Sequence, residues 1–185
     1  MPTALLLIDI QKAILDGKAA PGRQSLVDAA LNAMIERLEK VLSRARAAGM
    51  PVMVVQHDDI LDHRLAKGSE GWQLRPELAP LESEPLVHKR FCDAFYDTPL
   101  GEVLSDAGVT RVIIGGCMSQ WCIDTSVRSA VAHGYDVTLL SDGHMTGDSG
   151  SLTFDQIIAH HNATLDGFDA GTHSVRLARC DEIVF

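Results

Sequence analysis

Short apolar runs that stop abruptly at polar residues restrict the fold of this chain more than any other feature of its sequence. The first run, residues 4–8 (ALLLI), ends at Asp9, and the second, residues 52–55 (VMVV), ends at Gln56 and His57. Uninterrupted rather than alternating apolar residues are typical of strands that are buried on both faces of a parallel sheet. Further strands are predicted at residues 86–87, 111–114 and 135–140, with an edge strand at 182–185.

Helical patterns separate these runs. A long helix is predicted to begin with Ser25 as its N-cap and to end at Gly49, because apolar residues recur between them at helical spacing. Shorter helices are expected after Thr98 as N-cap, from about residue 120 to 133, and from Thr153 with Gln156 as its capping-box partner. Strands that alternate with helices imply right-handed crossovers and a sheet covered on both faces. The sequence therefore predicts one α/β domain over residues 1–185, a Rossmann-like three-layer α/β/α sandwich with a mainly parallel central sheet.

Charge and cysteine content exclude several classes of function. The 185 residues carry a formal net charge of -9, so a nucleic-acid or anionic-membrane surface, which needs clustered Lys and Arg, is not expected. The apolar run at residues 4–8 is too short for a membrane span and follows no basic region, so no signal peptide is expected. The four cysteines show neither CxxC spacing nor paired His ligands. We therefore expect free thiols, a cytoplasmic protein, and neither a metal nor a cofactor.

Polar residues stand at the ends of the predicted strands. They are Asp9, His57, Lys89, the turn at residues 115–122, and Asp142. Because the carboxyl ends of parallel strands share one edge of the sheet, and ligands bind in the crevice beyond that edge, these residues are expected to converge on a site.

Cys122 is the sharpest candidate among them. It lies in the first turn of a predicted helix, where unpaired N–H groups and the helix dipole stabilise a thiolate and an oxyanion. The alternative is a buried cysteine that acts as a small hydrophobic residue, as is equally open for Cys92 and Cys180. Asp9 follows an aliphatic run, so burial would raise its pKa and favour proton transfer, although a structural ion pair with Lys89 is the alternative.

Three sequence blocks resemble the signature blocks of the isochorismatase-like cysteine hydrolases, the superfamily of the nicotinamidases and N-carbamoylsarcosine amidase. The blocks are residues 5–11, residues 88–95 with Thr98 and Leu100, and residues 115–125. The resemblance implies that Asp9 is a general base, Lys89 its partner and Cys122 the nucleophile. It also implies a cis peptide bond between Met118 and Ser119, with the N–H groups of Met118 and Cys122 directed at the oxyanion. Homo-oligomers, dimers or tetramers, are usual in this superfamily.

The same resemblance narrows the reaction. Residues 56–63 lack the Asp-x-His spacing of metal-dependent nicotinamidases, which favours a solvated acidic loop over a metal site. The presence of Cys122 favours hydrolysis of an amide or carbamoyl C–N bond in a small-molecule substrate. Two alternatives stay open: a vinyl ether hydrolase that relies on Asp9, and a non-catalytic binding member of the fold.

Substrate contacts are predicted from the residues near these blocks. Trp72 and Phe95 are candidates for the walls of an apolar pocket, although Phe95 fits a core aromatic at least as well. The candidate polar contacts are Gln11, His57 and Gln120. His161 lies on the apolar face of its predicted helix and is expected to be a core histidine. The sequence assigns no role to His144 or His160.

Overall fold

The computed structural model describes residues 2–185, and its centre is a seven-stranded sheet in the order β3-β2-β1-β4-β5-β7-β6. The strands are β1 (Thr3–Ile8), β2 (Val52–His57), β3 (Leu86–Lys89), β4 (Arg111–Cys117), β5 (Asp136–Met145), β6 (Asp169–Ala170) and β7 (His173–Ala178). Every neighbouring pair is parallel except β6 and β7, which form a short antiparallel pair at one edge. The predicted mainly parallel sheet is confirmed.

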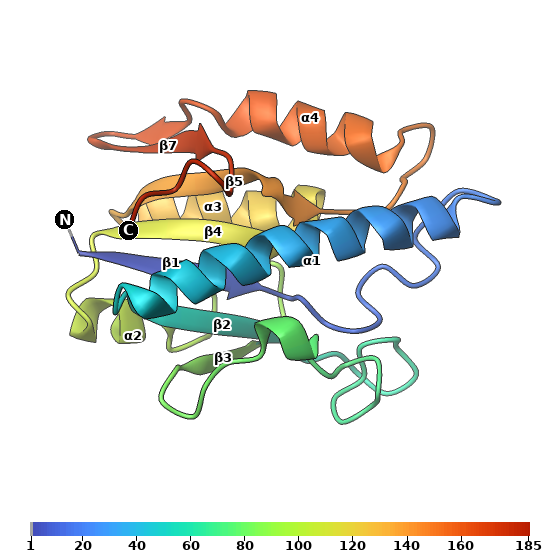
Figure 1. Ribbon diagram of the computed structural model, residues 1–185, viewed down its shortest axis with the longest axis horizontal. Helices are drawn as coiled ribbons and strands as arrows, with labels where there is room; N and C mark the ends of the chain where they lie inside the picture. Colours follow the sequence, from blue (N-terminus) through green and yellow to red (C-terminus); the bar gives the residue numbers. More distant parts are fainter. Residues whose placement is uncertain (1) are drawn as a thin grey trace.

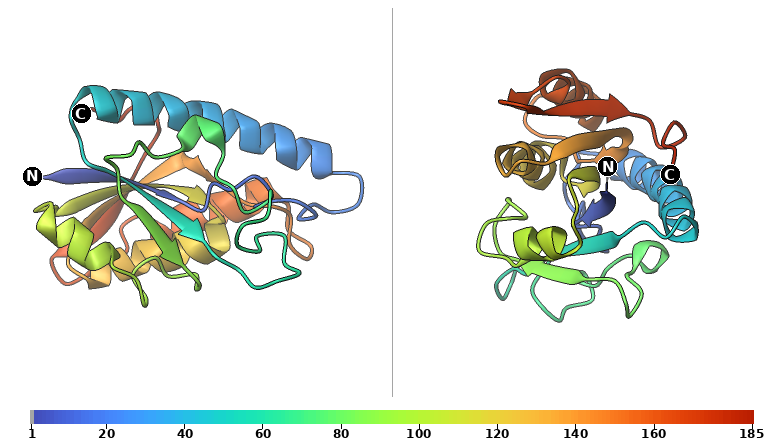
Figure 2. Two further views of the ribbon diagram at one scale, coloured as in Figure 1. Left: turned by 90° about the horizontal axis from the view of Figure 1, so that it is seen from below. Right: turned by 90° about the vertical axis from the view of Figure 1, so that its left-hand side faces the viewer.

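Helices cover both faces of this sheet. They are α1 (Gln24–Ala47), α2 (Leu100–Asp106), α3 (Asp124–Ala132) and α4 (Phe154–Leu165), with a short 3-10 helix, η1 (Pro76–Leu78), and a π-helix, η2 (Ser119–Ile123). Helix α1 crosses one face, and α3 lies behind the strands on the other (Figure 1). The end-on view in Figure 2 separates the three layers, with α1 on one side of the strands and α2 and α3 opposite it. The predicted three-layer α/β/α architecture is therefore confirmed.

The two helical layers enclose two apolar cores. Successive residues of β1 point to opposite faces, so Leu5 and Leu7 pack under α1, whereas Leu6 and Ile8 pack under α2 and α3. All four side chains are at most 1% exposed. Burial on both faces explains why the sequence shows an uninterrupted apolar run at this strand.

The C-terminal part of the sheet differs from the prediction. The edge strand expected at residues 182–185 is wrong: these residues form no strand, because Arg44 of α1 donates to the carbonyl oxygens of Ile183 and Cys180. Ile183 is buried under α1, and Val184 is 92% exposed. The strand that pairs with β5 is β7, where Val175 and Leu177 alternate with polar residues, a period-two signal that the prediction missed.

Two predicted helix starts are also displaced. Helix α1 begins at Gln24 after Arg23, so Ser25 lies inside the helix and is not its N-cap. Helix α2 begins at Leu100, and Pro99 takes the N-cap position that was expected for Thr98. The Thr98 hydroxyl still accepts a hydrogen bond from the Leu100 N–H, at 3.3 Å. Thr153 does cap α4 as predicted, in a capping box with Gln156.

The sheet brings the ends of four strands together. Ile8 pairs with Val55 on one side and with Gly116 on the other, and His57 pairs with Lys89. Asp9, His57, Lys89 and the turn after β4 therefore lie along one edge, as predicted. The prediction was wrong for Asp142, because β5 continues to Met145 and Asp142 contacts Cys180 and Arg179 instead. Within residues 2–185, no helix is long and apolar enough to cross a membrane.

Candidate active site

Asp9 leaves the central strand in an unusual backbone conformation and is fully buried. Its φ is 53°, in the left-handed region, and its N–H donates to the Val55 carbonyl at 2.9 Å. Its side chain is 0% exposed, and among the described residues its Oδ1 has no hydrogen-bond partner. A buried carboxyl oxygen with a free lone pair is suited to accept a proton.

Lys89 joins the site residues through one nitrogen atom. Its Nζ lies 2.6 Å from Asp9 Oδ2, 2.9 Å from the Phe91 carbonyl oxygen and 3.3 Å from Cys122 Sγ. The His57 Nδ1 atom is 3.4 Å away. Because the ammonium group has three N–H donors, these contacts occupy it fully. Lys89 is thus in direct contact with the candidate base and the candidate nucleophile.

Cys122 lies in η2, a π-helical turn that precedes α3. The Ile123 N–H bonds to the Met118 carbonyl five residues back, which is the wide spacing of a π-helix. Cys122 is 8% exposed and packs with the core on the α3 side. The predicted single helix from residue 120 to 133 is therefore divided into η2 and α3, and apolar periodicity gave no sign of the π-helical turn.

The cis peptide bond lies one residue earlier than predicted. It joins Cys117 to Met118, so the prediction of a cis bond between Met118 and Ser119 is wrong. Strand β4 continues to Cys117, which pairs with Met145, and η2 already begins at Ser119. The turn between strand and helix is thus confined to Met118.

Burial and charge shift the pKa values of the ion pair. Burial raises the pKa of Asp9 well above its ordinary value, and the nearby Cys122 sulfur adds to this effect, while Lys89 opposes it. Burial alone would lower the pKa of Lys89, but Asp9 and Cys122 outweigh it, and the pKa is raised. Lys89 therefore stays protonated, whereas Asp9 can exchange a proton nearer to neutral pH.

A second cysteine, Cys92, lies beside Cys122, and the two thiols titrate as a pair. A hydrogen bond with Cys122 lowers the pKa of Cys92 to about 6, with support from Lys89 and against the effect of burial. The same hydrogen bond, together with burial, raises the pKa of Cys122, which Lys89 and Asp9 only partly offset. Because the two thiols share their protons, a thiolate formed here belongs to the Cys92–Cys122 pair and not to one residue alone.

His57 lies inside the site and is linked to a small polar cluster. Its Nε2 is 3.3 Å from Asp59 Oδ2, and His63 Nδ1 is 2.8 Å from the same oxygen. Burial and the Lys89 charge lower the pKa of His57. No group of three or more His, Cys, Asp or Glu side chains among residues 2–185 is arranged to hold a metal ion. The Asp59 oxygen is instead shared by two imidazoles.

Gln11 and Trp72 contribute to the frame around the site. The Gln11 amide donates to the carbonyls of His57 and Trp72 and accepts from the His57 N–H, so its polar atoms are occupied by backbone. The Trp72 indole donates to Asp58 Oδ1 at 2.8 Å and stacks on His88. Both residues therefore position the loop after β2, and neither has a polar group left for a substrate in this arrangement.

Phe95 and Gln120, both predicted to contact a substrate, lie in different surroundings. The structure places Phe95 in the core on the α3 side, where it is 8% exposed and stacks on His133 and Tyr135 at the end of α3. This is the core position that was the alternative for Phe95, and it removes the residue from the pocket wall. Gln120 is partly exposed in η2, two residues before Cys122, and its Oε1 accepts a hydrogen bond from Thr146.

A buried chain of hydrogen-bonded side chains, which the sequence did not bring together, supports the turn beside Cys122. The Ser119 hydroxyl is 2.7 Å from His144 Nδ1, and His144 Nε2 is 2.9 Å from the Asn162 amide oxygen. Ser119 is 0% exposed, so it is not available as a nucleophile. The neighbouring His161 instead contacts Asp124, at 3.2 Å, and stays partly exposed rather than buried in the core. His144 thus fastens η2 to β5 and α4.

We expect acid to weaken the fold through His144. Burial lowers its pKa from 6.5 to about 4, so between these values the unfolded chain binds more protons than the folded one. Stability is therefore full above pH 6.5 and falls on acidification, by about 2 kcal/mol at pH 5 for this residue. Urea unfolding of the His144→Gln variant between pH 7.5 and pH 5 should show a correspondingly smaller loss than wild type. His160→Gln, at an exposed position, should lose as much unfolding free energy between these pH values as wild type does. The same loss in all three proteins would contradict the role of His144.

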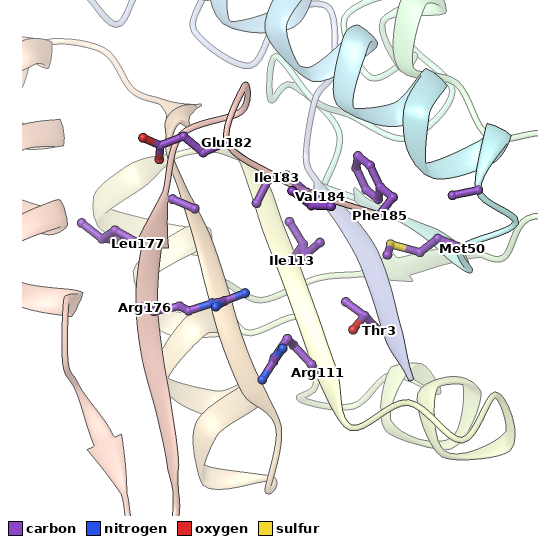
Figure 3. Close-up of a pocket in the computed structure, with 12 residues that line it drawn as sticks. Thr3, Met50, Arg111, Ile113, Arg176, Leu177, Glu182, Ile183, Val184 and Phe185 are labelled. Atoms are coloured by element: carbon purple, nitrogen blue, oxygen red, sulfur yellow. The ribbon is translucent and has the colours of Figure 1, made fainter. Parts of the chain in front are cut away.

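Two cavities bear on where a small molecule can enter. One of about 270 Å³ adjoins the site and is lined by Asp58, His88, Lys89, Arg90, Phe91 and Asp97. Another, of about 620 Å³, lies at the amino ends of β1 and β4, under residues 182–185 (Figure 3). The larger cavity is at the opposite end of the strands from Asp9, so of these two only the smaller one, which Lys89 lines, adjoins the candidate site.

The match to known proteins agrees with this geometry. Residues 3–163 match the Isochorismatase domain family, which is most of the chain. The chain therefore belongs to the isochorismatase family.

Three relatives give the range of this similarity. Streptothricin hydrolase from Streptomyces noursei is 38% identical over 146 residues, which cover 78% of this chain and 55% of that protein. This chain thus spans about half the length of that hydrolase. Ureidoacrylate amidohydrolase RutB from Methylobacterium radiotolerans is 24% identical over 175 residues, covering 78% of this chain and 68% of that protein. The crystal structure of an isochorismatase from Pseudomonas putida KT2440 superposes with a TM-score of 0.85, at 27% identity, covering 99% of this chain and 90% of that one.

Proposed function

We propose that this protein is a cysteine hydrolase that cleaves an amide or carbamoyl-type C–N bond of a small molecule through a thioester on Cys122. The observation that carries the proposal is the Lys89 ammonium group, which lies within 3.3 Å of both Asp9 and Cys122 inside a buried site. A nucleophile, a base and an orienting cation within contact distance are the parts that covalent hydrolysis needs.

The first half of the reaction forms the thioester. Asp9 takes the thiol proton of Cys122, which its raised pKa favours, and the sulfur attacks the substrate carbonyl carbon. The backbone N–H groups of Met118 and Cys122, at the start of the η2–α3 helical segment, stabilise the oxyanion. The protonated Asp9 then donates its proton to the departing nitrogen, and the C–N bond breaks.

The second half releases the acid product. Asp9, again a carboxylate, removes a proton from water, and the resulting hydroxide attacks the thioester. The proton returns to the Cys122 sulfur as the C–S bond breaks. Lys89 keeps its charge throughout and holds Asp9 toward the sulfur. No metal, cofactor or second protein is needed for these steps, and assembly into homo-oligomers stays a prediction.

Two of the relatives support this reaction class. The names streptothricin hydrolase and ureidoacrylate amidohydrolase describe hydrolysis, and the second describes hydrolysis of an amide-type bond. We carry over the reaction type and not their substrates, because the segment at residues 58–84 that borders the site has its own set of contacts in this chain.

A screen of small primary amides and carbamoyl compounds for ammonia release tests the proposal. We expect at least one compound to be hydrolysed, and iodoacetamide treatment to stop that turnover by alkylating the site thiols. A vinyl ether hydrolase that relies on Asp9 would release a carbonyl product from an enol ether and resist iodoacetamide. Activity of that kind would replace the proposal with the ether hydrolase. Ammonia release that survives complete alkylation of Cys122 would instead exclude the thioester and favour direct attack by water on the amide.

A further inference from the structure

Cys92 is a nucleophilic side chain beside the site that the proposed reaction does not use. All four cysteines are unpaired, and Cys92 is partly exposed, whereas Cys117, Cys122 and Cys180 are buried. It follows Lys89 by three residues, in the segment between β3 and α2. Its position beside Cys122 suggests that the Cys92 sulfur reacts with the Cys122 sulfur.

Contacts on both sides of Cys92 hold it next to Cys122. The carbonyl of the preceding residue, Phe91, accepts a hydrogen bond from Lys89 Nζ, the atom that also contacts Cys122 Sγ. The Cys92 carbonyl accepts from the Ser126 hydroxyl at 3.3 Å, and Ser126 lies four residues after Cys122. Cys92 packs against the apolar cluster that contains Cys122, and each thiol shifts the pKa of the other.

Charge around the pair favours oxidation there over the other cysteines. The pKa of Cys92 is lowered to about 6 by its hydrogen bond with Cys122, so the pair carries a thiolate at neutral pH. The thiolate is the form of cysteine that peroxide oxidises. Burial instead raises the pKa of Cys117, and it raises that of Cys180 to about 12. Both of these thiols stay protonated and less reactive.

We propose that Cys92 and Cys122 form a reversible disulfide when the protein meets hydrogen peroxide, with the disulfide blocking the nucleophile and protecting it from further oxidation. Peroxide transfers one oxygen atom to a thiolate of the pair, which becomes a sulfenic acid, and water leaves after protonation. The other sulfur attacks the sulfenic sulfur, a second water leaves, and the S–S bond forms. In sum, two thiols and one peroxide give one disulfide and two waters. A dithiol reductant reverses the change by exchange.

The segment that carries Cys92 has no regular secondary structure for a disulfide to disrupt. Cys92 belongs to residues 90–99, which form neither helix nor strand, so an adjustment of its backbone toward disulfide geometry breaks no sheet ladder. Cys122 is held by η2 and Lys89. The movement required is therefore on the Cys92 side, and the fold of the sheet is unaffected.

Peptide mapping of peroxide-treated protein tests the proposal without any substrate, so its outcome is independent of the hydrolase assignment. The folded protein is treated with hydrogen peroxide and then unfolded in urea, where the remaining thiols, including the buried ones, are blocked with N-ethylmaleimide. Intact and digested masses are then measured. We expect the protein to lose the mass of two hydrogen atoms, to take up two maleimides instead of four, and to give one cross-linked peptide pair that joins Cys92 to Cys122. Dithiothreitol should restore four reactive thiols.

Two variants separate the role of Cys92 from general oxidation. In Cys92→Ser, whose folding is checked by circular dichroism, peroxide should drive Cys122 to sulfinic acid that dithiothreitol does not reverse. Cys180→Ser, which removes a thiol far from the site, should still form the Cys92–Cys122 disulfide. The proposal is overturned if wild-type Cys122 becomes sulfinic acid while Cys92 remains open to maleimide, or if the disulfide forms with Cys117 or Cys180. If Cys92→Ser does not fold, the wild-type map and Cys180→Ser decide the question alone.

Discussion

Replacing Cys122 with alanine should reduce turnover of any hydrolysed substrate by a factor on the order of 10⁴ to 10⁶, the scale seen when a covalent nucleophile is removed. The substitution deletes the sulfur atom that Lys89 contacts at 3.3 Å, and Asp9 then has no thiol proton to accept. The side chain is small and lies against the core on the α3 side, so we expect the fold to remain intact, with a stability loss of about 1 kcal/mol.

Steady-state ammonia release, with urea unfolding measured in parallel, checks this expectation. Cys180→Ala is the matched control, because Cys180 is also buried but lies beside Asp142, away from Asp9 and Lys89. It should keep wild-type turnover at a similar cost in stability. A folded Cys122→Ala protein with full activity would exclude the thioester mechanism and favour direct attack by water.

Replacing Gly116 with alanine should prevent stable folding, with an expected loss of more than about 4 kcal/mol. Gly116 has a φ of 132°, which residues with a side chain rarely adopt, and it pairs with Ile8 in the central ladder. A Cβ atom there would lie 2.0 Å from the Ile8 carbonyl oxygen and 2.8 Å from the Ile8 nitrogen. Both neighbours are backbone atoms of the buried strand that carries Asp9, so neither can move aside.

Gly101→Ala provides the comparison. Gly101 lies in α2, and a Cβ atom added there meets nothing within 4 Å. The alanine should stabilise the helix by roughly 0.5–1 kcal/mol. Thermal and urea unfolding, followed by circular dichroism, should place the two variants on opposite sides of wild type. A Gly116→Ala protein that is soluble and unfolds at the wild-type midpoint would contradict the close approach of β4 to β1.

Much of the site follows from where strands end. Asp9 was predictable because it follows the buried strand β1, and Lys89 because it ends the short edge strand β3; the parallel sheet brings those ends to one edge. Cys122 was predictable only in part. Its place near a helix start did not distinguish it from other cysteines, and the matching sequence blocks were needed.

Other parts of the site could not be read from local patterns. Ser119, His144 and Asn162 are separated by about twenty residues each, and their hydrogen bonds exist only once β5 and α4 pack beside η2. Trp72 and Gln11 have the residue types of substrate contacts, yet tertiary packing assigns them to backbone and loop partners. Residue type predicts which chemistry is available, and only packing determines how many polar groups remain free.

The crowding around Lys89 Nζ has a consequence for what the protein can accept. The side chains of Asp9 and Lys89 are both 0% exposed, so their opposite charges offset each other and are shielded from counter-ions in the solvent. In the proposed reaction, the steps from thiol to thioester and back move one proton among Asp9, Cys122 and the substrate, and they add no net charge next to this ion pair. A substrate whose reacting end carried a formal charge would have to desolvate it there without an available counter-charge. Uncharged carbonyl groups should therefore be favoured at the reacting end, with any ionised part of the molecule held outside, toward Asp58 and Arg90.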